Sequence, residues 1–199
     1  MNAFLTGVIF LIAFTATGKS IDCVSCSTTN GTDCSGEVTT CDDDLTFCQT
    51  ARTELKKDGV ASNQVYKYCG GDDEPHWIYR EESLTTFFQL EVENCETDKC
   101  NEKPAQLTPR VNTTNGVKCM HCFKDYSTDC NSEKTIECTG DMNKCLFVSG
   151  NICNNGTAFY ACALRHCTNI ASADLHPRYD EVDTGNIQKI EISEGIKDA

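Results

Sequence analysis

Two pairs of cysteines, Cys23–Cys26 and Cys119–Cys122, have the C-x-x-C spacing found in zinc knuckles and in redox-active dithiols. The chain contains 16 cysteines, an even number, and both pairs recur within a repeated pattern. In a secreted chain, this arrangement is typical of structural disulfides. A thiol that is locked in a disulfide cannot act as a nucleophile. We therefore predict no metal or redox function at either pair.

The other side chains that could carry catalysis or bind cations form none of the usual motifs. The histidines belong to no H-E-x-x-H zinc motif, and no G-x-S-x-G nucleophile elbow occurs. The acidic runs 42–44 and 72–74 lack the spaced carboxylates and glycine of a calcium loop, so we interpret them as solvated turns. The sequence predicts a protein that is not an enzyme and needs no cofactor. The four histidines are His76, His121, His166 and His176.

The composition is that of an acidic, disulfide-rich chain. The 199 residues include 17 basic and 30 acidic side chains, for a net charge of −13. This acidity argues against binding to nucleic acid or to an anionic membrane surface. A cysteine content of 16 in 199 is typical of small scaffolds whose hydrophobic cores are too thin to fold without cross-links.

Residues 1–20 are typical of a secretory signal peptide. Residues 3–14 form an uncharged apolar run that is too short to span a bilayer, and the small residues Gly18 and Ser20 precede the predicted cleavage. Cleavage would remove Lys19 and no acid, leaving a net charge of −14. The polar C-terminal end lacks the hydrophobic tail of a lipid-anchor signal. We expect a soluble, extracellular protein without a membrane anchor.

The cysteines fall into two sets of eight with nearly equal spacing. The first set opens with 2, 7, 6 and 6 intervening residues, and the second with 2, 7, 7 and 6. This agreement indicates tandem duplication of one disulfide module. Residues 104–116 contain two prolines and no cysteine, as a linker does, so we expect module 1 at 21–103 and module 2 at 117–170. The sets are Cys23, Cys26, Cys34, Cys41, Cys48, Cys69, Cys95 and Cys100, then Cys119, Cys122, Cys130, Cys138, Cys145, Cys153, Cys162 and Cys167.

Alternating β-branched and aromatic residues predict an all-β fold. The turn sequence Lys56–Gly59 separates two predicted strands of module 1, and Asn154–Gly156 separates two in module 2. Both are typical tips of β-hairpins. No stretch of useful length has helical periodicity. Strands are expected at residues 46–53, 64–68, 83–92, 144–152 and 157–162.

The spacing C-x2-C-x7-C-x6-C-x6-C, a hairpin, a sixth cysteine and Cys95-ETDK-Cys100-Asn101 together resemble the three-finger family of the urokinase receptor and the snake toxins. The resemblance covers both modules. It implies two tandem three-finger domains, each with three β-hairpins radiating from a knot of disulfides. The pairing that it implies in module 1 is Cys23–Cys48, Cys26–Cys34, Cys41–Cys69 and Cys95–Cys100.

Module 2 follows the family pattern less closely. We match Cys162 to the family's sixth cysteine, because 16 residues then separate it from Cys145, with the Asn-Asn-Gly turn in the middle. The terminal C-x4-C-N is missing after Cys167. We therefore expect an open or degenerate third finger and a loosely held acidic tail over 171–199. The expected bonds are Cys119–Cys145, Cys122–Cys130, Cys138–Cys162 and, by default, Cys153–Cys167.

Two groups of secreted two-module relatives resemble this chain. One is the sodefrin-precursor-like factors, which are amphibian courtship pheromone proteins, and the other is the gamma class of phospholipase inhibitors. The signal segment, the acidity, the loss of a cysteine where Asn94 stands and the tail ending 193–199 are closer to the first group. The resemblance implies a non-enzymatic protein that binds a receptor as a courtship pheromone. The alternative is direct binding and inhibition of a secretory phospholipase A2.

Two segments could form a binding face. Residues 75–79 hold the only tryptophan, with Phe87 and Phe88 nearby, and Trp and Tyr are enriched at binding hot spots. A small β-module also needs aromatic residues in its core, so both interpretations stay open. The basic segment 52–57 is either a partner contact or an ordinary soluble fingertip. Candidate N-glycosylation sites are Asn30, Asn112 and Asn155.

Overall fold

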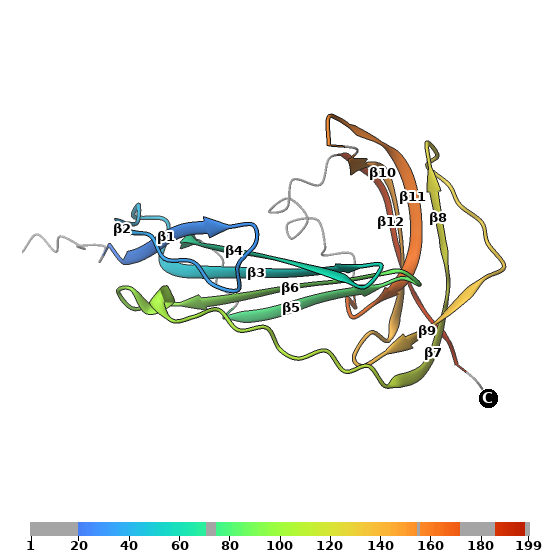
Figure 1. The fold of residues 1–199 in the computed structure, drawn as a ribbon, viewed down its shortest axis with the longest axis horizontal. Helices are drawn as coiled ribbons and strands as arrows, with labels where there is room; N and C mark the ends of the chain where they lie inside the picture. Colours follow the sequence, from blue (N-terminus) through green and yellow to red (C-terminus); the bar gives the residue numbers. More distant parts are fainter. Residues whose placement is uncertain (1–19, 71–74, 155, 172–185, 198–199) are drawn as a thin grey trace, which may run out of the picture.

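The computed structural model describes residues 20–70, 75–154, 156–171 and 186–197. Over these ranges the chain forms 13 β-strands and one short 3₁₀ turn (Figure 1). Eight disulfides join all 16 cysteines. The predicted all-β, disulfide-rich class is confirmed. None of the described residues belongs to a helix that is long and apolar enough to cross a membrane.

Module 1 is a sheet of long antiparallel hairpins. Its central finger, β3 and β4, turns at Asp58 and Gly59, whose φ angles of 50° and 85° are those that favour Asp-Gly in a two-residue hairpin turn. The predicted hairpin at this position is confirmed. The elements of module 1 are β1 (Asp22–Thr28), β2 (Glu37–Thr40), β3 (Phe47–Lys57), β4 (Val60–Gly70), β5 (His76–Glu82), β6 (Thr86–Cys95) and the 3₁₀ turn η1 (Cys100–Glu102).

The third finger of module 1 differs in part from the prediction. The strand expected at 83–92 begins only at Thr86, because Ser83 starts the tip of the finger: its N–H donates to the Thr86 carbonyl at 2.8 Å. Strand β5 is not among the predicted strands, although its buried Trp77 and Tyr79 alternate with more exposed neighbours. Strand β6 pairs with both β5 and β3, so the third finger extends the central sheet.

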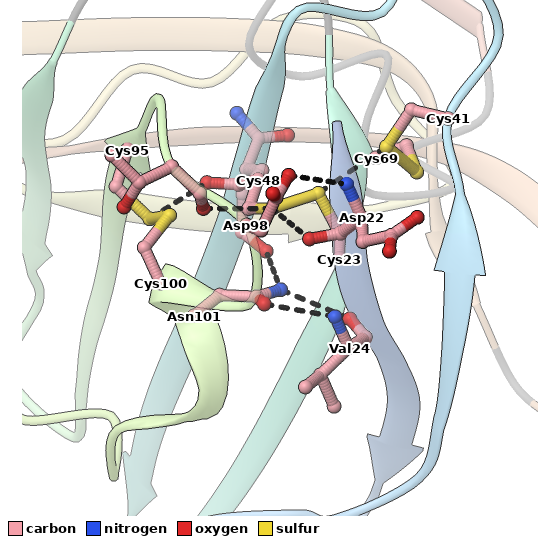
Figure 2. Close-up of a disulfide and its surroundings, with 12 residues drawn as sticks. Asp22, Cys23, Val24, Cys41, Cys48, Cys69, Cys95, Asp98, Cys100 and Asn101 are labelled. Carbon is pink, nitrogen blue, oxygen red and sulfur yellow. Dashed lines mark hydrogen bonds between the residues drawn. A yellow bond between two sulfur atoms is a disulfide. The ribbon is translucent and has the colours of Figure 1, made fainter. Parts of the chain in front are cut away.

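Asn101 closes the base of module 1 beside the disulfides (Figure 2). Its side chain is buried, and it follows Cys100, which is bonded to Cys95. The side-chain carbonyl accepts the N–H of Val24 at 2.9 Å, while the amide donates to the Val24 carbonyl at 2.9 Å and to the Gln49 carbonyl at 3.5 Å. One side chain thus joins β1 and β3 to the end of the module.

Replacing Asn101 by alanine is expected to lower the free energy of unfolding by about 3 kcal/mol, because it leaves a buried backbone N–H and C=O without partners. Guanidinium denaturation with the disulfides intact measures this loss. Asn131→Ala, at an exposed asparagine of module 2, is the matched control and should be nearly neutral. Equal stability of the two variants would contradict this role for Asn101.

Module 2 repeats the plan of module 1. Its central strand β10 pairs with both β11 and β12, as β3 pairs with β4 and β6. Strand β7 begins at Thr114, inside the segment predicted as linker. The strands of module 2 are β7 (Thr114–Met120), β8 (Cys122–Asp125), β9 (Thr135–Thr139), β10 (Lys144–Asn154), β11 (Phe159–Thr168), β12 (Asn186–Glu194) and β13 (Ile196–Lys197).

The expectation of a loosely held tail over 171–199 is wrong for the part that the structure describes. Strand β12 pairs with β10 over nearly its full length, and β13 pairs with β7. Ile190 and Ile192, two residues apart on β12, pack against the cluster that contains Leu146. This burial of alternate isoleucines is what holds the segment to module 2. The rest of the expected tail, 172–185 and 198–199, lies outside the described residues.

Two of the disulfides expected in module 2 are wrong. The structure pairs Cys138 with Cys167 and Cys153 with Cys162, with Cα–Cα distances of 5.6 Å and 5.9 Å. The strand register explains this, because Cys167 lies directly opposite Cys145 in the disulfide knot, as Cys69 lies opposite Cys48 in module 1. Cys162 is about 16 Å further along β11, at about 3.3 Å per residue, and cannot reach the knot.

The other six bonds coincide with those that the family resemblance implies. In module 1 these bonds are Cys23–Cys48, Cys26–Cys34, Cys41–Cys69 and Cys95–Cys100, and in module 2 they are Cys119–Cys145 and Cys122–Cys130.

A single sheet runs through both modules. Strand β11 of module 2 pairs with β5 of module 1 at two positions, Cys167 with Glu82 and Thr168 with Glu81. Figure 1 shows that the tips of the long hairpins of module 1 meet the curved strands of module 2. The hydrophobic cluster around Trp77 includes Leu146 of module 2, so the core also crosses the junction. The two modules are therefore joined by backbone pairing as well as by side-chain packing.

Candidate binding cleft between the modules

The aromatic residues considered for a binding face are core residues. Trp77 and Tyr79 are 5% and 4% exposed and share a cluster with Leu146 of module 2. Phe87 is buried in a second cluster, formed with the disulfide knot of module 2, and Phe88 packs edge-on against Tyr79 with ring centroids 5.8 Å apart. The interpretation of these residues as a partner-binding face is therefore wrong. They hold the modules together.

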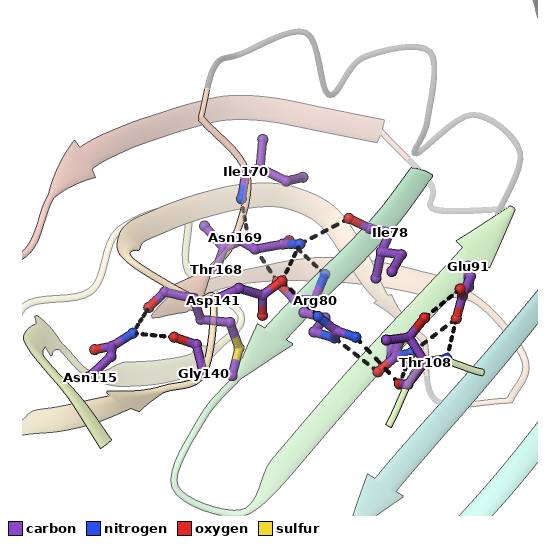
Figure 3. A network of polar contacts seen from close by, with 12 residues as sticks. Ile78, Arg80, Glu91, Thr108, Asn115, Gly140, Asp141, Thr168, Asn169 and Ile170 are labelled. Atoms are coloured by element: carbon purple, nitrogen blue, oxygen red, sulfur yellow. Dashed lines mark hydrogen bonds and ion pairs between the residues drawn. The ribbon is translucent and has the colours of Figure 1, made fainter. Parts of the chain in front are cut away.

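Arg80 on β5 organises the polar part of the junction (Figure 3). The guanidinium is buried and donates to Gln89 on β6 at 3.0 Å and to the carbonyl of Thr108 in the linker at 3.3 Å. It also forms an ion pair with Asp141 of module 2 at 2.6 Å. The backbone N–H of Arg80 donates to the Asn169 side chain at 2.8 Å. One residue thus joins β5, β6, the linker and module 2.

Two glutamates at the end of β5 continue this junction. Glu81 accepts hydrogen bonds from the Tyr79 hydroxyl and from His166 of β11, the latter at 2.9 Å. Glu82 forms an ion pair with Arg110 of the linker and accepts the Thr139 hydroxyl of module 2 at 2.6 Å. Both carboxylates therefore take part in holding the modules together.

Beside these contacts lies a cleft of about 290 Å³. One wall consists of the tips of the second and third fingers of module 1, including Lys57 and Ser83. The other wall consists of β8 and β11, including Phe123 and Leu164. In this second wall Phe123 is a large apolar side chain that is 56% exposed. This is a concave surface with an exposed aromatic side chain in one wall.

His121 lies in the floor of the cleft. Burial lowers its pKa below the ordinary value of 6.5 and outweighs a hydrogen bond with the backbone of Arg165, which would raise the pKa. Its Nδ1 atom is buried and has no hydrogen-bond partner among the residues that the structure describes.

The basic segment 52–57 divides into two parts. Arg52 is half-buried and donates to the carbonyl of Ala105 at 2.8 Å, so it holds the linker against module 1. Lys56 and Lys57 are exposed at the fingertip, and Lys57 lines the cleft. The basic tip therefore contributes one cation to the candidate binding surface.

The remaining sites predicted from the sequence are not brought together. Asn30 and Asn112 are exposed, as glycosylation requires, while Asn155 lies outside the described residues. The acidic run 42–44 is exposed, and 72–74 lies outside the described residues, as does His176. The cysteines of both C-x-x-C pairs are in structural disulfides, Cys23–Cys48, Cys26–Cys34, Cys119–Cys145 and Cys122–Cys130.

Sequence comparison accounts for the repeated hairpins and the two disulfide knots. The sequence profile of the u-PAR/Ly-6 domain matches residues 19–103 and 115–182. The chain belongs to the u-PAR/Ly-6 family. The two matched ranges correspond to the two modules, each of which is a u-PAR/Ly-6 domain. Both domains have the predicted three-finger plan, and no cysteine follows Cys167 to close the third finger of module 2.

Several relatives of this u-PAR/Ly-6 protein are phospholipase A2 inhibitors. It is 30% identical to phospholipase A2 inhibitor NAI of Notechis ater over 157 residues, which cover 77% of this chain and 76% of the relative. It is 35% identical to a gamma-type phospholipase A2 inhibitor chain of Elaphe quadrivirgata over 138 residues, 68% of each chain. Among solved structures, mouse TEX101 matches 88% of this chain and 99% of its own, with 16% identity and a TM-score of 0.39.

Proposed function

We propose that this u-PAR/Ly-6 protein is a secreted, non-enzymatic inhibitor that binds a phospholipase A2 directly. The observation that carries the proposal is 30–35% identity to phospholipase A2 inhibitors over 68–77% of the chain. These relatives favour the inhibitor over the sodefrin-like pheromone that the signal segment and tail suggest. The signal segment at 1–20 supports secretion, which oxidised cysteines also require.

The physical properties of the chain suit this mode of action. The fingers of module 1 are held by disulfides at one end, and at the other end strand β5 pairs with β11 of module 2. Such fingers lose little conformational entropy on binding, so more of the contact energy appears as affinity. The net charge of −13 attracts a basic partner over long range and speeds association at low ionic strength. A basic secreted phospholipase A2 is therefore the partner expected to be bound fastest.

We place the contact at the inter-module cleft. Phe123 is a large apolar side chain, more than half exposed, on a strand fixed by pairing with β11. Leu84 is an exposed apolar residue of the third fingertip, between Ser83 and Thr85, which line the cleft. Exposed aromatic residues beside a concave surface are typical anchors of a protein interface. Because both modules contribute to this surface, neither module alone would supply the whole contact.

Purified protein is expected to inhibit a basic secreted phospholipase A2 at a stoichiometric ratio, with faster association at low salt. Phe123→Ala should weaken binding by at least about 1 kcal/mol, or roughly fivefold or more, as expected for an interface anchor. Tyr66→Ala removes an aromatic residue that is 38% exposed on β4 and does not line the cleft, so it is the matched control. Enzyme inhibition assays and surface plasmon resonance measure both effects.

The two parts of the proposal fail separately. If the protein neither binds nor inhibits secreted phospholipases, the inhibitor function is wrong. If inhibition occurs but Phe123→Ala and Tyr66→Ala have the same affinity as the wild type, the function stands and the contact lies elsewhere than the cleft.

A further inference from the structure

His76, Glu91 and Glu93 converge on one face of the third finger of module 1. In the β5–β6 register His76 lies directly opposite Glu93, and Glu91 is two residues from Glu93, so all three side chains project from the same face. One nitrogen or oxygen atom of each lies within 4.8 Å of the other two. The three residues also line a cavity of about 700 Å³ between β6 and the linker.

The carboxylate of Glu91 is held in a fixed orientation. Its side chain is 4% exposed, and it accepts the N–H of Thr108 at 2.5 Å and the Thr108 hydroxyl at 2.8 Å. The N–H bonds Oε2 and the hydroxyl bonds Oε1, the oxygen that also faces His76. Hydrogen bonds of this kind orient a carboxylate that binds a metal ion.

Two carboxylates meet one imidazole at this place. Glu91 is a buried carboxylate whose only ion pair among the described residues is with His76, at 2.8 Å between Nε2 and Oε1. The side chain of His76 is 46% exposed. Glu93 adds a second, exposed carboxylate two residues away. A divalent cation at this place would be held by charge as well as by geometry, since two carboxylates face it.

We infer that His76, Glu91 and Glu93 form a binding site for a divalent transition-metal cation, with Zn²⁺ the best fit. One imidazole nitrogen and two carboxylate oxygens are a donor set that zinc accepts, and the exposed side of the cluster leaves a fourth position for water. Binding would widen the 2.8 Å contact between His76 Nε2 and Glu91 Oε1, because an ion that is about 2.0–2.2 Å from each atom needs the two atoms further apart. No sequence motif points to this site, because His76 is 15 residues from Glu91 and no recognised ligand spacing links them.

The site would cross-link a part of module 1 that has no covalent cross-link. Strand β5 contains no cysteine, so no disulfide ties it to β6 or to the linker. A metal held by His76 on β5 and by two residues of β6 joins the two strands of the finger. Through Thr108 it also fixes the linker that leads to module 2. In a small domain such an ion has the same stabilising role as a disulfide.

The test is a calorimetric titration of the oxidised full chain with ZnCl₂ at pH 7.5. We expect one saturable site, whose affinity falls more than about tenfold in His76→Gln and in Glu93→Gln. Thr108→Val, which removes only the hydroxyl that orients Glu91, is expected to weaken binding by about 10–100-fold. Glu137→Gln, at an exposed carboxylate on β9 of module 2, is the matched control and should bind as the wild type does.

Thermal denaturation gives a second readout, since zinc should raise the melting temperature of the wild type but not of Glu93→Gln. Glu93 is exposed, so this variant is expected to fold normally. The inference is overturned if the wild type shows no saturable binding. It is equally overturned if Glu93→Gln and His76→Gln bind zinc as tightly as Glu137→Gln, because the ion then lies elsewhere.

Discussion

Replacing Cys138 and Cys167 together by alanine is expected to prevent secretion of folded protein, whereas replacing Cys153 and Cys162 together should leave a folded but less stable one. The first bond spans 29 residues and the second 9. Loop closure alone makes these bonds worth about 3.6 and 2.6 kcal/mol respectively. The first bond also lies in the buried cluster of module 2, so its loss removes packing as well, for a total of about 5 kcal/mol.

Secreted yield and guanidinium denaturation of the two double variants measure this difference. A single Cys153→Ala variant tests the pairing itself, because the structure requires that it frees the thiol of Cys162. Peptide mapping after thiol labelling identifies the freed cysteine. Labelling of Cys167 in that variant would contradict the pairing in the structure and restore the one expected from the sequence.

Two features of the sequence favour different partners for Cys138. The Asn-Asn-Gly turn favours Cys162, and the cysteine spacing favours Cys167. The Asn-Asn-Gly turn marks the tip of the β10–β11 hairpin, and matching Cys162 to the knot gives that turn a central position. The spacing is the better guide, since 21 residues separate Cys145 from Cys167 and 20 separate Cys48 from Cys69. A bulge lies between Gly150, which is opposite Cys162, and Cys153, which is opposite Tyr160. Cys153 is therefore close enough to Cys162 to form the second bond.

Local turn chemistry is predictable from the sequence, while contacts between the modules are not. The tip at Asp58 and Gly59 follows from the backbone conformations that these residues favour, whatever the rest of the chain does. The burial of Trp77 depends on Leu146, a residue of the other module, and no local pattern contains that contact. The same applies to the binding cleft, whose walls come from segments such as Ser83 and Phe123 that are far apart in the sequence.

Strand β12 is an intermediate case. Ile190 and Ile192 have the alternation of a half-buried strand, but they lie in an acidic, cysteine-free segment whose composition is typical of a tail. The strand forms because β10 offers it a free edge, as β3 does to β6 in module 1. Applying the strand order of module 1 to module 2 would have predicted it, since the repeat in the cysteines implies a repeat in the sheet.

Arg80→Ala is expected to uncouple the two modules. The buried guanidinium joins Gln89, Thr108 and Asp141, so its removal leaves buried polar groups without partners on both sides of the junction. We expect a loss of about 3 kcal/mol, less than for a fully buried ion pair because the side chain of Asp141 is 49% exposed. Arg80→Lys should recover little of this lost stability. The planar guanidinium donates to three acceptors at once, and a lysine ammonium cannot reproduce that geometry.

Trp77, the only tryptophan, reports on this event because it packs in the cluster that includes Leu146 of module 2. In the wild type we expect tryptophan fluorescence and far-UV circular dichroism to follow one guanidinium transition. In Arg80→Ala the fluorescence change should occur at lower denaturant than the loss of strand, because the junction opens before the disulfide-bonded modules unfold. Arg52→Ala is the control: Arg52 bonds a linker carbonyl within module 1, so its loss should lower stability without separating the two signals. Coincident transitions in Arg80→Ala would mean that the continuous sheet between β5 and β11, and not the arginine, holds the modules together.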